Sequence, residues 1–342
     1  MTYNFKNDYT EGMHPSILDA LIKTNAEQQE GYGHDLYCCK AIDILQQKIR
    51  NPRADIHFIS GGTQANTVVI ASVLKPYESV ISAGTAHINT HETGAIENTG
   101  HKINVAQSLN GKLSCKDIQA VLDLHTDEHM VKPRLVFISN ATETGTIYNK
   151  QDLKALFLFC KSKGLILYLD GARIGSALCS YENDLNLAEL SEFVDLFYIG
   201  GTKNGAMAGE AVIINNETLK AGFRFHMKQN GALLAKSRIF GVQFLELFKD
   251  GLFFKLAEHA NEMALKLSRN IAQAGFQFLY KPVTNQIFPI FENKIIENLN
   301  KKYGFYVWEN IDKKTSAIRL VTSWATKEEA VDNFIKDLKY CS

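Results

Sequence analysis

The most constraining feature of this 342-residue chain is an alternation of short, apolar, β-rich runs with longer segments of mixed polarity between about Ile56 and Asn215. Parallel strands joined by helices produce this pattern. Several runs are almost continuously apolar, as expected for strands that are covered on both faces. The sequence therefore predicts an α/β fold in which a buried, mostly parallel sheet is flanked by helices. The runs are DIHFISGG, SVISAGTAH, RLVFISN, LILYLDGAR, LFYIGGT and AVIINN.

Small or polar residues end all of these runs except the last. In open α/β sheets, ligands bind outside the carboxyl ends of the strands. We therefore expect these endings to converge on one crevice that holds the functional site. They are Gly61-Gly62-Thr63, Ala86-His87, Asn140, Asp170-Gly171-Ala172-Arg173 and Gly201-Thr202-Lys203.

The pattern of the chain changes after Asn215, where apolar residues recur at helical spacings of three and four. Short strand-like segments return near the C-terminus as FQFLY, NQIFPIF and AIRLVTSW, and a last helical segment, KEEAVDNFIKDLKY, follows them. A chain of this length can divide its core between two domains. We predict an N-terminal arm over residues 1–21, a major domain over residues 22–247 and a smaller α+β domain over residues 248–342.

The overall charge selects no class of charged partner, because 37 basic residues balance 37 acidic ones. No global field favours nucleic acid or an anionic membrane, so a ligand must be recognised locally. The N-terminus lacks the pattern of a signal peptide, and no segment approaches the roughly 20 apolar residues of a membrane span. The cysteines show no metal-ligand spacing. We expect a cytoplasmic protein with no membrane span, no nucleic-acid partner and no metal site.

The segment SGGTQANTVVIASVL places glycines and Thr63 between a predicted strand and an apolar helix. Free N–H groups and the helix dipole favour a phosphate at such a helix start. A tight turn with Thr63 near the N-cap explains the same residues without a ligand. Because the segment matches neither GxGxxG nor the P-loop, it disfavours dinucleotides and nucleoside triphosphates.

Asp170 and Lys203 follow two further predicted strands and carry opposite charges. A carboxylate at the end of an apolar strand is costly unless it is paired, and a protonated pyridine nitrogen is a suitable partner. An ion pair with Arg173 or a helix N-cap is the alternative for Asp170. A partly desolvated lysine acts as an amine nucleophile on an aldehyde, whereas an isolated loop lysine is usually solvated. Their location at one sheet edge, together with the phosphate segment, favours the catalytic interpretation.

At this point the chain resembles the threonine aldolase and β-eliminating lyase family of pyridoxal-phosphate enzymes. The matching segments keep the family's order and spacing over nearly the whole chain. The resemblance implies an aspartate-aminotransferase-like major domain that binds pyridoxal 5'-phosphate, and a homodimer or homotetramer with active sites at subunit interfaces. The segments are FKNDYTEGMHP, SGGTQAN, GTAHINTHETGA, LYLDGARIG, GGTKNGA, TNQIF and AIRLVTSW.

The same resemblance implies how the cofactor is held. Lys203 forms a Schiff base with the cofactor, and Asp170 pairs with the pyridine nitrogen. His87 stacks on the ring, while Gly62 and Thr63 bind the phosphate.

The substrate-binding residues are also implied by the resemblance. Arg173 and Arg319 match arginines that hold the substrate carboxylate, a task for which a planar guanidinium is suited. A structural ion pair is the alternative for Arg319. His91 and His34 are candidates for proton transfer to or from the substrate hydroxyl. Asn7-Asp8-Tyr9 departs from the serine-aspartate-threonine start that is usual in the family, which leaves the contact of its carboxylate open.

The reaction that the resemblance implies is retro-aldol cleavage of a β-hydroxy-α-amino acid, such as L-threonine or allo-threonine, to glycine and acetaldehyde. The cofactor ring serves as the electron sink when the Cα–Cβ bond breaks. β-Elimination from a β-substituted amino acid is the nearest alternative, and a non-catalytic cofactor-binding protein is another. The preferred side chain and the base for the β-hydroxyl stay open at this stage.

Overall fold

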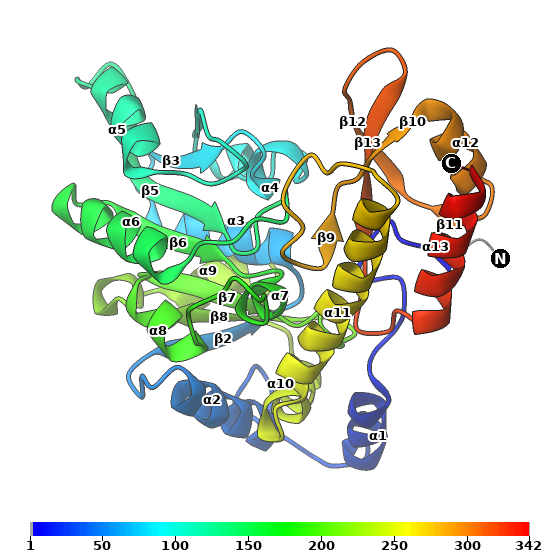
Figure 1. The fold of residues 1–342 in the computed structure, drawn as a ribbon. Helices are drawn as coiled ribbons and strands as arrows, with labels where there is room; N and C mark the ends of the chain where they lie inside the picture. The colour runs from blue at the N-terminus through cyan, green and yellow to red at the C-terminus, as the bar shows by residue number, and fades with distance from the viewer. Residues whose placement is uncertain (1–2, 342) are drawn as a thin grey trace.

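A seven-stranded sheet forms the centre of the larger part of the computed structural model, which describes residues 3–341 (Figure 1). The strand order is β2-β8-β7-β6-β5-β3-β4. Neighbouring strands are parallel in the part of the sheet formed by β7, β6, β5, β3 and β4. β8 runs antiparallel to both of its neighbours, β2 and β7. The predicted α/β fold with a mostly parallel sheet is confirmed. The strands are β2 (Asp55–Ile59), β3 (Glu78–Ala83), β4 (Ile103–Ala106), β5 (Lys132–Ser139), β6 (Ile166–Asp170), β7 (Leu196–Gly200) and β8 (Glu210–Ile214).

Two strands depart from the sequence-based expectation. β8 corresponds to the run AVIINN and is antiparallel, because the loop from Gly201 to Gly209 contains no helix to carry the chain back across the sheet. A parallel connection needs about a dozen residues or more. The short edge strand β4 was not predicted. As a consequence of its direction, β8 presents its amino end, Glu210, at the edge where its neighbours present their carboxyl ends.

Helices flank the central sheet, and local sequence sets several of their starts. Ser114 with Asp117, and Asn186 with Glu189, form reciprocal capping boxes at α5 and α8. α10 packs on α2 and α1, and α3 packs on α9. The helices are α1 (Pro15–Thr24), α2 (Leu36–Lys48), α3 (Gly62–Val73), α4 (His87–Thr90), α5 (Cys115–Leu124), α6 (Lys150–Ser162), α7 (Ile174–Leu178), α8 (Leu187–Glu192), α9 (Phe223–Gln229) and α10 (Arg238–Lys249), with 3₁₀ turns η1 (Glu97–Thr99) and η2 (Glu217–Leu219).

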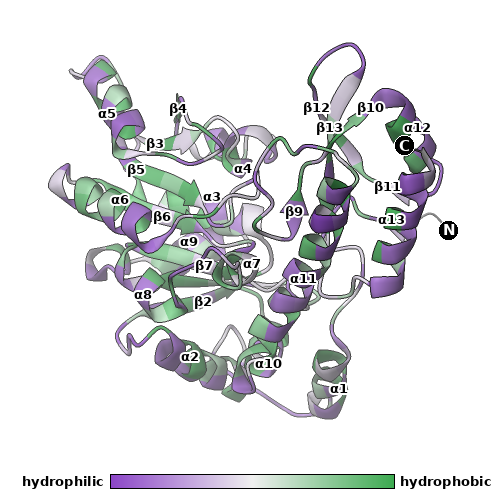
Figure 2. Cartoon of the chain, viewed as in Figure 1, coloured by the Kyte–Doolittle hydropathy of each residue, from purple (hydrophilic) through white to green (hydrophobic). Residues whose placement is uncertain are grey.

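Burial explains why the strand runs are almost continuously apolar. Every residue of β3, β6, β7 and β8 is buried. Figure 2 shows these strands in hydrophobic colours and the outer helices with hydrophilic faces. A sheet covered on both faces requires this composition.

The C-terminal part of the chain builds a second, smaller sheet beside α11 (Leu252–Gln273) (Figure 1). Its strands have the order β10-β13-β12, with β9 paired to β13. The segment FQFLY, read as a strand, contributes only an isolated bridge between Phe278 and Pro289. The remaining elements are β1 (Tyr3–Asn4), β9 (Gln286–Ile287), β10 (Ile290–Glu292), α12 (Asn293–Asn300), β11 (Tyr303–Gly304), β12 (Tyr306–Asn310), β13 (Thr315–Val321) and α13 (Glu328–Cys341).

Two separate hydrophobic cores support these two parts. The larger core contains buried residues from Ile17 to Leu256. The smaller core joins Phe5 to buried residues from Met263 to Leu338. The change from one core to the other therefore falls within α11, and the start of the chain packs with the C-terminal part. The predicted domain boundaries stay a prediction. Within residues 3–341, no helix combines the length and apolar character that crossing a bilayer requires.

Candidate active site

A cavity of about 370 Å³ lies at the carboxyl edge of the central sheet. All of the residues predicted to bind cofactor or substrate line it, so the expected convergence of the strand endings is confirmed. Asn140 is an exception among those endings, because its side-chain oxygen accepts a hydrogen bond from the Tyr148 N–H and it does not line the cavity. The predicted residues in the wall are Gly62, Thr63, His87, Asp170, Arg173, Lys203 and Arg319.

Strand register explains why these side chains meet. Ser139 at the end of β5 pairs with Asp170 at the end of β6. Glu210 pairs with Gly200 on one side and with Ile59 on the other. The ends of four neighbouring strands and the start of β8 therefore form one continuous edge.

Asp170 is buried and accepts hydrogen bonds on both carboxylate oxygens. The Tyr198 hydroxyl donates to Oδ1 at 2.6 Å and the Ala172 N–H donates to the same oxygen at 2.9 Å. The Asn66 amide donates to Oδ2 over a longer 3.3 Å. The alternative ion pair between Asp170 and Arg173 is not formed. These donors stabilise a carboxylate, and Oδ2 keeps capacity for one stronger partner.

Lys203 brings its amine into the cavity without a direct partner. Within residues 3–341, its Nζ makes neither a hydrogen bond nor an ion pair. Burial lowers the pKa of Lys203 and the positive charge of Arg173 lowers it further, although Asp8, Asp170 and Glu210 act in the opposite direction. A lowered pKa raises the fraction of neutral, nucleophilic amine.

Glu210 lies beside this lysine and was missed by the sequence reading. Its carboxylate accepts hydrogen bonds from the Gly201 N–H at 3.0 Å and from the Thr202 hydroxyl at 2.9 Å. Burial raises the pKa of Glu210 to about 8. One oxygen thus holds the backbone, and the other a side chain, of the loop that carries Lys203.

The glycines at the strand ends are required by contacts within the chain. A Cβ atom on Gly200 would lie 2.5 Å from the Ala172 carbonyl oxygen, and one on Gly171 would collide with the Tyr198 carbonyl oxygen. The loops after β6 and β7 therefore approach each other more closely than other residues allow.

Arg173 is held by a carboxylate from the N-terminal segment. Asp8 accepts hydrogen bonds from Arg173 Nε at 2.7 Å and Nη2 at 3.0 Å, and from the Asn285 amide at 2.9 Å. Burial alone would raise the pKa of Asp8, but Arg173, Lys203 and the hydrogen bonds lower it overall. The contact of the N-terminal carboxylate, left open by the sequence, is thus a fork-like pair with Arg173.

Arg319 reaches the cavity from β13. Its guanidinium lies over the rings of Tyr306 and Trp308, and Nη2 donates to the Lys6 carbonyl oxygen at 3.2 Å. Within residues 3–341, Arg319 forms no ion pair, and its buried Nε lacks a hydrogen-bond partner. The alternative of a structural ion pair is therefore not realised.

Gln286 lies on the same face of the small sheet as Arg319. It pairs with Val321, two residues after Arg319, and alternate residues of a strand share a face. The amide nitrogen of Gln286 donates to the Thr142 carbonyl oxygen at 3.1 Å, which leaves the buried Oε1 without a donor.

His87 stands at the start of α4, and a buried chain of polar groups links it to Asp170. Its Nδ1 lies 2.7 Å from Glu92, and Glu92 accepts a hydrogen bond from Asn66 at 2.8 Å. Asn66 also donates to Asp170. His91 is stacked on His87 with ring centroids 5.5 Å apart and also lines the cavity.

α3 begins at the cavity wall with no side chain capping its N-terminus. The N-cap residue is Gly61, so Thr63 is an exposed residue of the first turn and not the cap. The first N–H groups of a helix lack partners within the helix. They are positioned to bind an anion at this end of the cavity.

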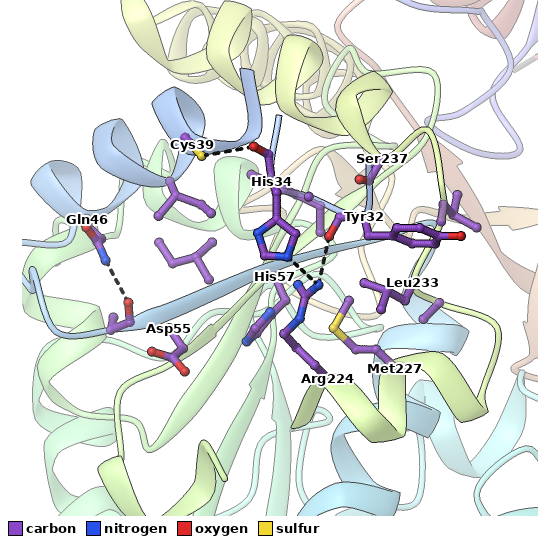
Figure 3. A pocket seen from close by; sticks show the side chains of 17 residues that line it. Tyr32, His34, Cys39, Gln46, Asp55, His57, Arg224, Met227, Leu233 and Ser237 are labelled. Carbon is purple, nitrogen blue, oxygen red and sulfur yellow. Dashed lines mark hydrogen bonds between the residues drawn. The ribbon is translucent and has the colours of Figure 1, made fainter. Parts of the chain in front are cut away.

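His34 lies elsewhere, in a second pocket of about 310 Å³ between α2, β2 and α9 (Figure 3). Nη2 of Arg224 donates a hydrogen bond to Nε2 of His34 at 3.2 Å and another to the Tyr32 carbonyl oxygen. Within this chain, His34 is therefore not a candidate for proton transfer in the cavity. The pocket also contains His57, in which burial and then Arg224 lower the pKa to about 4.

Comparison with known sequences identifies relatives along the whole chain. The sequence model of the family described as beta-eliminating lyase matches residues 7–294. The low specificity L-threonine aldolase of Pseudomonas sp. (strain NCIMB 10558) is 34% identical over 341 residues, covering 98% of this chain and 96% of that protein. The enzyme of the same name from Escherichia coli (strain K12) is 26% identical over 234 residues, which cover 68% of each chain.

Comparison with solved structures gives a consistent result. Threonine aldolase from Leishmania major superposes with a TM-score of 0.97 and 48% identity over 99% of each chain. An aspartate aminotransferase from Thermus thermophilus shares the fold, with a TM-score of 0.74 at 14% identity over 100% of this chain and 92% of that one.

Proposed function

The chain belongs to the beta-eliminating lyase family, and from this premise we propose that it is a pyridoxal-phosphate-dependent lyase that cleaves β-hydroxy-α-amino acids to glycine and an aldehyde. L-Threonine and allo-threonine are the proposed substrates, because the relatives in Pseudomonas and Leishmania are threonine aldolases. The observation that carries the proposal is the unpartnered amine of Lys203 in a cavity that also contains Asp170 and Arg319.

The residues of the cavity fit the proposed cofactor. Lys203 offers an amine of lowered pKa to an aldehyde, and Asp170 offers Oδ2 to a protonated ring nitrogen. The uncapped start of α3, with Gly62 and Thr63, suits a phosphate. His87 lines the cavity with a side chain that is 38% exposed, which leaves ring surface for stacking.

Pyridoxal phosphate, when bound, supplies an aldehyde that condenses with amines and a conjugated ring that takes up the electron pair released at Cα. Asp170, oriented by hydrogen bonds from Tyr198 and the Ala172 N–H, would pair with the ring nitrogen and favour its protonated form. Glu92 would hold His87 in one orientation through Nδ1. Lys203 would hold the cofactor and yield its place to the substrate amine.

Arg319 is the better placed of the two arginines for the substrate carboxylate. Arg173 already uses Nε and Nη2 on Asp8, whereas Arg319 has no carboxylate partner and an unpaired Nε. A guanidinium can bind a carboxylate through two parallel hydrogen bonds. We propose that Arg319 supplies this fork and that Arg173 contributes positive charge beside it.

We also propose a cytoplasmic homodimer or homotetramer with interface active sites. The large apolar side chains of Tyr32, Phe225 and Ile239 are exposed on the single chain, and a subunit interface would cover such surface. The division into an arm, a major domain and a minor domain remains our proposal, and the two separate cores support it.

Product analysis tests the proposed function. The purified protein, supplied with pyridoxal phosphate, should convert L-threonine or allo-threonine to equal amounts of glycine and acetaldehyde. Ammonia and a keto acid from β-substituted amino acids would instead identify a β-eliminating enzyme. Cofactor binding without any product would contradict both catalytic functions.

A further inference from the structure

Retro-aldol cleavage needs a base at the substrate β-hydroxyl, and the residues assigned so far leave this task open. Lys203 and Asp170 act on the cofactor, and Arg319 acts on the carboxylate. The inference below rests on the proposed aldolase function. A candidate base must line the cavity, have a proton-accepting atom free of other bonds and be held in place.

Glu143, in the loop after β5, meets these requirements. Its Oε1 accepts a hydrogen bond from the Ser139 hydroxyl at 2.8 Å and another from the His87 N–H at 2.9 Å. Within residues 3–341, no other residue donates a hydrogen bond to its Oε2, and Glu143 lines the cavity. One carboxylate oxygen is therefore anchored while the other is available to a ligand.

The other two carboxylates of the cavity, and Nδ1 of His87, are already committed. Both oxygens of Glu210 accept hydrogen bonds from the lysine loop, and both oxygens of Asp170 are bonded. Nδ1 of His87 is bound by Glu92. Among the acidic groups in the wall, Glu143 alone within residues 3–341 has an oxygen with no bond.

The surroundings of Glu143 give its carboxylate a higher proton affinity than an ordinary carboxylate has. Burial raises the pKa of Glu143, and the negative charge of Asp170 on β6 raises it further. The hydrogen bonds from Ser139 and His87 oppose this rise, and Arg173 lies within electrostatic reach. A carboxylate with a raised pKa is a stronger proton acceptor than an ordinary one.

We propose that Glu143 accepts the proton of the substrate β-hydroxyl as the Cα–Cβ bond breaks. The O–H bond breaks and its proton passes to Oε2 of Glu143. The electron pair of that bond forms the second bond of the aldehyde carbonyl, and the pair of the Cα–Cβ bond remains with Cα. Cα then takes up one proton to give glycine, and Glu143 returns its proton to solvent, so no oxidant or reductant is needed.

His91 is the rival base, because it lines the same cavity. Its Nδ1 lies 2.6 Å from the Thr90 hydroxyl, and burial followed by the charge of His87 lowers its pKa. His91 is exposed, however, and within residues 3–341 its ring is oriented by the adjacent Thr90 hydroxyl and by stacking on His87. The anchored carboxylate is the better placed acceptor.

Glu143→Gln tests the proposal, since the amide keeps the size and one acceptor oxygen but removes the base. The holoenzyme should lose about 10²–10⁴-fold in kcat/KM for threonine cleavage, the range for a general base. The absorbance spectrum of the bound cofactor should be unchanged. Exchange of the glycine α-proton with deuterium, followed by NMR, needs no β-hydroxyl base and should stay within about threefold of wild type.

The pH dependence of kcat/KM separates Glu143 from His91. The acidic limb of the wild-type profile should disappear in Glu143→Gln and persist in His91→Asn. Formate should restore part of the cleavage rate of Glu143→Ala, which a structural role does not predict. Near-normal cleavage by Glu143→Gln, parallel loss of exchange and cleavage, or loss of the acidic limb in His91→Asn would each overturn the proposal. Failure of the wild-type enzyme to release glycine from threonine would instead refute the proposed function.

Discussion

The active-site cavity and the second pocket around His57 and Arg224 have similar volumes, about 370 and 310 Å³, and both contain histidine and arginine. They differ in which polar groups lack a partner. Within residues 3–341, the cavity contains two cationic groups with unused donors, because Arg319 Nε is buried without a hydrogen bond and Lys203 Nζ makes none. In the second pocket, the cation Arg224 donates to the Tyr32 carbonyl oxygen and to His34 (Figure 3), and the unpaired buried atoms His57 Nε2 and Ser237 Oγ belong to uncharged groups.

This difference indicates which of the two pockets is the active site. Buried polar groups in folded proteins are almost always hydrogen-bonded, because an unpaired one costs about 1–3 kcal/mol. Where several such groups meet at one sheet edge, a bound ligand can form the missing hydrogen bonds and offset this cost. Neither volume nor the presence of unpaired polar atoms distinguishes the two pockets, whereas unpaired cationic groups beside buried carboxylates do.

Among the variants that compare the two pockets, the largest effect is expected for Asp170→Asn. The amide still accepts from Tyr198 and the Ala172 N–H, but it cannot keep a ring nitrogen protonated. Turnover should fall by about 10²–10³-fold, the range for loss of one fixed electrostatic partner, while cofactor remains bound. Asp55→Asn in the second pocket is the matched control, because Asp55 is 45% exposed and forms only a 3.7 Å pair with Lys220. Near-normal turnover of Asp170→Asn would contradict a catalytic role for the cavity carboxylate.

Arg319→Lys should have the next largest effect. Lysine keeps the charge but cannot form the two parallel hydrogen bonds of a guanidinium. Loss of one charge-assisted bond costs about 1.5–3 kcal/mol, so kcat/KM should fall by roughly ten- to a hundredfold with an unchanged cofactor spectrum. The role in substrate binding would be refuted by unchanged kcat/KM for every accepted amino acid.

A smaller effect, on stability alone, is expected from His57 in the second pocket. Its pKa of about 4 in the folded state lies below the ordinary value of 6.5, so the unfolded chain binds more protons between these pH values. Stability should therefore fall by about 2 kcal/mol as the pH is lowered from 7 to 5. Denaturant unfolding of wild type and His57→Gln at both pH values measures this component, which the variant should lack. An equal pH dependence in both proteins would contradict the buried, neutral state of His57.

Residues that directly follow a predicted strand could be located from sequence. Asp170 and Lys203 end apolar runs, and the rule for ligand sites in open sheets places them at one edge. The hydrophobic pattern is sufficient for these two residues because it fixes both the strand and the edge at which it ends. Arg319, in contrast, was expected at the site only from the resemblance to the lyase family.

Other site residues depend on facts that the pattern does not contain. Asp8 meets Arg173 only because the N-terminal segment packs with the C-terminal core. Glu210 joins the site because β8 is antiparallel, which the run AVIINN does not reveal. Glu143 lies three residues after Asn140, in a loop that has no helical or strand-like hydrophobic periodicity from which its course could be predicted. The loop after β5 was the available signal, since it begins at the same sheet edge.

The most direct test of the central claim is chemical trapping of the cofactor in the cavity. The protein should be incubated with pyridoxal phosphate, reduced with borohydride, digested and mapped by mass spectrometry. The label is expected on Lys203. The variant Lys203→Ala should fold but take up no label, and it should release no glycine from threonine. A label on Lys228, which lies over the Tyr32 ring, or on any other lysine outside the cavity would contradict this assignment.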